Sequence, residues 1–97
     1  MPNYIVLANF TEQGIRNVKQ TTQRAEALKA EAEKLGVKVK DFFWTLGSCD
    51  VVTVFEAPDD ETITRLMLQV GSLGNVRTQT LRAFTREEMD GILAKLP

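Results

Sequence analysis

The chain has 97 residues, of which 43% are hydrophobic and 26% charged, and this length and composition suit one packed domain over residues 1–97. Twelve basic and thirteen acidic residues give a formal net charge of -1, which provides no general field for attracting nucleic acid or an anionic membrane. There is no histidine and only one cysteine, Cys49, so the commonest general base and metal ligand are missing and no internal disulfide can form. No apolar stretch is long enough to span a bilayer, and we expect a cytoplasmic protein without a metal ion or cofactor.

The first third of the chain predicts a strand followed by a helix. Residues 4–10 are rich in β-branched and aromatic side chains, and apolar residues occur on both faces, which is typical of a largely buried strand. Thr11 can cap a short helical turn after this strand. Apolar residues then recur at helical spacing until Gly36 ends the helix, at positions Ala25, Leu28, Ala32 and Leu35.

The next segment predicts a second strand that turns back into a third. Alternation over residues 37–45 places Lys40, Phe42 and Trp44 on the face opposite Val39. A short turn then leads into an apolar run, the arrangement expected of an antiparallel hairpin. We therefore expect the second and third strands to pair directly.

The rest of the chain completes the pattern with a helix, a strand and a final helix. After the third strand at 51–55, residues 58–61 form a helix-start signal, and Gly71 marks the end of that helix. Residues 76–84 alternate as a fourth strand, and 85–88 match a capping box. The final helix carries an apolar stripe made of Met89, Ile92, Leu93 and Leu96.

This element order predicts an α+β fold of the ferredoxin-like type, β-α-β-β-α-β with a C-terminal helix, in which both long helices pack on one face of an antiparallel sheet. The other face must then present large apolar groups, either Phe42 and Trp44 or Val39 and Phe43. A second copy laid sheet against sheet would cover that face, whereas the C-terminal helix could also fold back over it. We expect the first arrangement, a homodimer or a higher homo-oligomer.

The hairpin between the second and third strands holds the candidate site residues. Asp50 opens an apolar strand, where its carboxylate can accept turn N–H groups or point into a cavity as a base or ligand anchor. Trp44 can stack on a planar ligand or fill an interface. Cys49 can act as a nucleophile only if its thiolate is stabilised, and no histidine is present to do so, which favours a packing role. No cluster of Cys, Asp and Glu has metal-site spacing.

Several segments together resemble the GYD domain family over essentially the whole chain: 4–7, 10–17, 44–47 with Asp50, 56–61, and 77–84. That family is named for a Gly, Tyr, Asp motif at this hairpin, where the present chain reads Gly47-Ser48-Cys49-Asp50. The glycine and the aspartate match, whereas the tyrosine does not. The resemblance implies the dimeric α+β barrel form of the ferredoxin-like fold.

The resemblance implies little chemistry, because related barrels include cofactor-free oxygenases, stress-response proteins and effector-sensing domains. Our leading hypothesis is a homo-oligomeric module that binds a small molecule or another protein. Its cavity would lie at the sheet-sheet interface, with Trp44, Gly47, Cys49 and Asp50 near the mouth. The alternative is a small cofactor-independent oxygenase or isomerase that uses Asp50 or a lysine as base. A purely structural role without a ligand is the third interpretation.

Overall fold

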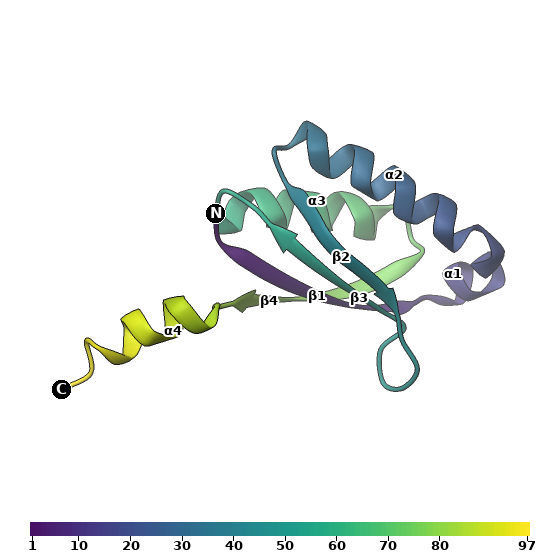
Figure 1. Ribbon diagram of the computed structural model, residues 1–97. Helices are drawn as coiled ribbons and strands as arrows, with labels where there is room; N and C mark the ends of the chain where they lie inside the picture. The colour runs from purple at the N-terminus through teal and green to yellow at the C-terminus, as the bar shows by residue number, and fades with distance from the viewer.

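Two long helices lie side by side above one face of a four-stranded antiparallel sheet in the computed structural model, which describes residues 1–97 (Figure 1). In chain order the elements are β1 (Asn3–Phe10), α1 (Glu12–Arg16), a single 3₁₀ turn η1 (Val18–Gln20), α2 (Thr21–Lys34), β2 (Lys38–Trp44), β3 (Val51–Glu56), α3 (Asp60–Ser72), β4 (Val76–Ala83) and α4 (Arg86–Leu93). The strands are ordered β2-β3-β1-β4, with β1 between β3 and β4. This order confirms the predicted ferredoxin-like fold.

The core lies between the sheet and the two long helices. Alternation along β1 turns Tyr4, Val6 and Ala8 toward the helices, where all three are buried, as the sequence pattern predicts. From β3 and α3 the core takes Phe55 and Leu66, each with no exposed surface. Full burial of one such large apolar side chain stabilises the folded state by roughly 1.5–3 kcal/mol. The spacing of apolar residues therefore accounts for which faces of β1, β3 and α3 turn inward.

The strict alternation predicted for β2 is wrong because the strand contains a β-bulge. The register shifts between Val39 and Asp41, so Lys40 is the extra residue. After the shift, Phe42 lies opposite the buried Thr53 of β3, on the same side of the sheet as Val39. Trp44 follows Phe42 to that helix-covered side, where the centre of its ring lies 4.8 Å from the centre of the Phe42 ring.

Side-chain caps fix where three helices begin. The hydroxyl of Thr11 accepts a hydrogen bond from the Gly14 amide at the start of α1, and the carboxylate of Asp59 does the same for Thr62 in α3. Thr85 and Glu88 form the predicted capping box of α4. Gly14 also lies against the loop before β4, where a Cβ atom would come within 1.9 Å of the Asn75 carbonyl oxygen. Only glycine permits this close contact between the start of α1 and that loop.

Helix α4 projects from the end of β4 and does not cover the sheet (Figure 1). Its first turn is tied to β4 through the guanidinium of Arg82, which lies 4.0 Å from the Glu88 carboxylate and 4.5 Å from the centre of the Phe84 ring. The alternative for this helix, that it folds back over the sheet of its own chain, is wrong. The chain reaches 51 Å along its longest axis.

Candidate functional site

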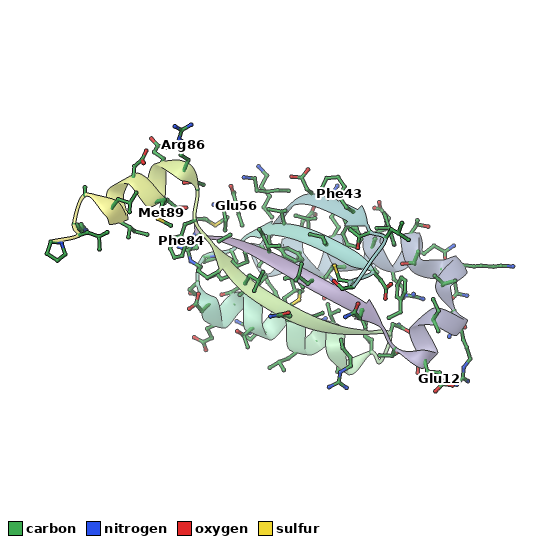
Figure 2. The ribbon with its side chains drawn as sticks, turned by 90° about the horizontal axis from the view of Figure 1, so that it is seen from below. Glu12, Phe43, Glu56, Phe84, Arg86 and Met89 are labelled. Atoms are coloured by element: carbon green, nitrogen blue, oxygen red, sulfur yellow. The ribbon has the colours of Figure 1, made fainter.

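The sheet has one face without helices, and its centre is apolar. Figure 2 looks onto this side, with Phe43 and Glu56 labelled. Because β1 and β3 are the inner strands, their outward side chains form the middle of the surface, and the outer strands add one large apolar group each. We call this surface the open face, and its apolar residues are Ile5, Leu7, Phe43, Val52, Val54 and Leu81.

The large apolar side chains that the outer strands place on the open face are well exposed to solvent. Phe43 is 56% exposed and Leu81 is 39% exposed. Polar groups surround the apolar centre: Lys40 pairs with Glu56 at 3.2 Å near the β2 edge, and Arg77 and Gln79 lie along β4. An apolar centre with a polar rim is the usual anatomy of a protein-protein interface.

A second unpartnered apolar surface lies on α4. Three residues of the predicted stripe lie on α4 and face solvent, with Met89, Ile92 and Leu93 between 41% and 52% exposed, whereas Leu96 follows the end of the helix and is 64% exposed. The helix has eight residues, and isolated helices of this length are not stable in water. Figure 2 shows Phe84, Arg86 and Met89 where this helix leaves the sheet.

The hairpin loop that carries the candidate residues extends from the sheet on the side away from α2 and α3 (Figure 1). Leu46 at its tip is fully exposed. Gly47 has φ +122°, a conformation that side chains with a Cβ rarely adopt, which explains glycine at this point of the turn. The loop is closed by a backbone hydrogen bond of 2.8 Å from Thr45 N–H to the Asp50 carbonyl.

Asp50 joins the start of β3 to the end of β1. Its carboxylate accepts a hydrogen bond of 2.9 Å from the Phe10 amide, and its own amide donates to the Ala8 carbonyl at 2.8 Å. The side chain thus continues the pairing of the two strands beyond the last ladder bond, as a turn aspartate often does. These contacts favour the structural role over that of a catalytic base.

The remaining candidates lie on different sides of the hairpin. Cys49 is a free, half-buried thiol, and the Thr45 hydroxyl donates to its carbonyl at 2.6 Å and lies 3.6 Å from its sulfur. Trp44 turns toward α2, where its indole N–H donates to the Thr21 hydroxyl at 3.0 Å. The structure therefore brings Cys49 and Asp50 together at the loop, whereas Trp44 lies on the helix side of the sheet.

One polar contact in the interior has no counterpart among the sequence-based expectations. The Tyr4 hydroxyl donates a hydrogen bond to the Asp60 carboxylate at the start of α3, and the Arg82 guanidinium lies 5.7 Å from the Tyr4 ring centre. Burial, with the hydrogen bond to Asp60 adding to it, raises the pKa of Tyr4 to about 12. The two residues are 56 positions apart, and nothing in the sequence pattern pairs them. The ring anchors the first turn of α3 to β1.

Two further observations bear on the site. No three side chains of Cys, Asp or Glu come together in a way that could hold a metal ion. None of the helices has the length and apolar character needed to cross a membrane.

Comparisons with known proteins agree with one another. The family model of the GYD domain matches residues 4–93. The chain is 38% identical over 84 residues to the "Glutamine synthetase and cystathionine beta-lyase binding protein" of Thermus thermophilus, an alignment that covers 86% of this chain and 88% of that protein. It also superposes on the crystal structure of TTHA0845, likewise from Thermus thermophilus, with a TM-score of 0.57 and 26% identity, over 88% of this chain and 95% of that one.

Proposed function

Because this chain belongs to the GYD domain family, we propose that it works as a homo-oligomeric module that binds other proteins. The open face carries the proposal, since it is an apolar surface at the centre of the sheet with nothing of its own chain over it. The free thiol of Cys49 suits a reducing compartment, and we place the module in the cytoplasm on that ground.

A second copy of the chain is the occupant that we assign to the open face. Two-fold symmetry lets a single patch complement itself, so the apolar centre of one copy would meet the same centre of the other. The charged groups at the outer strands, including the Lys40–Glu56 pair, would then remain at the solvated rim. The hairpin tip, with Leu46, Gly47 and Cys49, extends on this same side and would border any cavity between the two sheets.

For the protein partners, the printed name of the relative gives the first candidates. We propose that this chain binds the glutamine synthetase and the cystathionine β-lyase of its own organism, because the relative is 38% identical over most of both chains. The apolar stripe of α4 supports a binding role, since it leaves the body of the protein ready to contact another chain. Such contacts would require no catalytic group, in keeping with the structural role that we assign to the Asp50 carboxylate.

The test uses the purified full chain and the two purified enzymes. Light scattering at several concentrations measures the mass in solution, and we expect a dimer or a higher multiple. Biolayer interferometry with the immobilised chain measures binding, and we expect saturable binding to at least one of the two enzymes and none to an unrelated enzyme of similar charge. A strict monomer would refute self-association. No saturation with either enzyme up to about 10 μM would refute the assignment of these partners.

A further inference from the structure

A cavity of about 160 Å³ lies on the other side of the sheet, between the sheet and the two long helices. Most of its lining is apolar and comes from both layers, for example Phe55 from β3, Leu28 from α2 and Leu66 from α3, while Ala8, Thr53 and Ala25 are among the smaller lining residues. The space is partly open to solvent, so a small molecule from solution can reach it. An apolar cavity of about 150 Å³ is known to admit benzene, which sets the size of the molecule that fits.

The cavity is bounded along the helices by polar groups. At one point the amide of Gln69 on α3 donates to the carboxylate of Glu31 on α2 at 3.0 Å, which links the two helices across the gap. The hydrogen bond from Gln69, together with Lys34, holds the pKa of Glu31 below its ordinary value. The carboxylate of Glu31 is therefore already paired with Gln69 and Lys34.

The guanidinium of Arg24, which also borders the cavity, has no acidic partner. Arg24, two helical turns before Glu31, also lines the cavity. Its guanidinium donates to the carbonyls of Asn17 at 2.9 Å and Gly14 at 3.4 Å, and no carboxylate lies within 4.0 Å of it. A guanidinium has five N–H donors, and these two contacts fix its position while leaving donors for a further acceptor.

We propose that this cavity binds a small monocarboxylic acid whose apolar part, about the size of benzene, enters the gap between α2 and α3 and whose carboxylate pairs with Arg24. The apolar walls disfavour ligands with a highly polar non-carboxylate part. The guanidinium of Arg24, which has no carboxylate partner, favours the acid over its neutral amide. The site lies on the helix side of the sheet, so it is separate from the open face and does not depend on self-association.

The chain contains its own reporter for this site. Trp44 is the only tryptophan, and its indole N–H donates to Thr21, which lines the cavity. Its ring also packs on Phe42, another lining residue, at 4.8 Å between ring centres. A ligand that enters the cavity changes the surroundings of both contacts and therefore the fluorescence of Trp44.

The experiment titrates the full chain with sodium hexanoate and sodium phenylacetate, and with hexanamide and phenylacetamide as neutral counterparts, while Trp44 fluorescence is recorded. We expect saturable changes with the acids and affinities at least about tenfold weaker for the amides. The variant Arg24→Gln should remove the preference for the acids. The control Lys29→Gln alters a basic residue of the same helix outside the cavity and should leave the preference unchanged.

A second variant tests the cavity itself. Ala25→Leu fills part of the space and should abolish the response to both acids, with thermal unfolding used to verify that the variant is folded. If that variant does not fold, the Arg24→Gln comparison still decides the question. The proposal is overturned if neither acid gives a saturable change, or if acids and amides bind equally well to the unaltered chain. It is also overturned if Arg24→Gln retains the preference for acids.

Discussion

The substitution Leu7→Lys on the open face should separate the copies of the chain without unfolding them. Leu7 lies on the central strand β1, opposite Val52 of β3 and Gln79 of β4. Burial of a leucine side chain contributes roughly 1.5–3 kcal/mol, and two-fold symmetry counts the change twice, so the dimer would lose about 3–6 kcal/mol. Since about 1.4 kcal/mol corresponds to a tenfold change in affinity, the dissociation constant should rise at least about 100-fold.

Sedimentation velocity over a range of concentrations measures this change, and urea unfolding of the dilute protein measures whether the fold survives. Because Leu7 faces away from the core, we expect the free energy of unfolding of the separated chain to change by no more than about 1 kcal/mol. The matched control is Leu68→Lys on the outer side of α3, where the leucine is 69% exposed. Self-association through the open face is refuted if Leu7→Lys keeps the mass of the original protein, or if Leu68→Lys dissociates it equally.

Three further predictions follow from particular contacts. Gly14→Ala should destabilise the fold by about 1–3 kcal/mol in urea unfolding, because the new methyl group would meet the Asn75 carbonyl; an unchanged midpoint would contradict that close contact. The absorbance of Tyr4, the only tyrosine, should show a titration midpoint near pH 12, and since the unfolded chain ionises near pH 10, the free energy of unfolding should fall between about pH 10 and 12. Removal of residues 85–97 should change the free energy of unfolding of the separated chain by less than about 0.5 kcal/mol, because α4 lies away from the sheet and the core, and a larger loss would show that it supports the core.

The sequence predicted the sheet and its two covering helices because those elements obey simple periodicities. Alternation in β1 separated Tyr4 and Val6 from Ile5 and Leu7, and the structure keeps that division between the helix side and the open face. The capping box at Thr85 likewise placed the start of α4 correctly, since caps act within one turn. Local rules of this kind need no knowledge of the rest of the chain.

Two features depended on contacts that no local rule contains. The bulge at Lys40 moves Phe42 and Trp44 to the helix side, and a single extra residue is enough to invert every later side chain of a strand. The place of α4 depends on what it packs against, and its apolar stripe alone could not decide between its own sheet and another chain.

The candidate site was only partly visible in the sequence for the same reason. Spacing drew attention to the hairpin, but the contact of Asp50 with the Phe10 amide joins residues 40 positions apart and appears only in the fold. The cavity beside Arg24 is lined by residues of all four strands and both long helices, and an alanine in a helix, such as Ala25, gives no sign of the space next to it. A cavity between elements that are distant in the chain has no sequence motif by which it could be predicted.

The central position of β1 also governs the order in which the chain can fold during synthesis. Of the four strands it is the earliest in the chain, yet its neighbours are β3 and β4, which begin at Val51 and Val76. The hairpin of β2 and β3 can pair as soon as residue 56 is available, because its two strands are close in the chain. The strand β1 can then pair with β3, but its other edge has no partner until β4 is available, so the sheet is completed only once residue 83 has been made. Until that step, the backbone N–H and C=O groups on this edge of β1 are free to pair with a strand of another chain, and the pairing with β4 removes this opportunity.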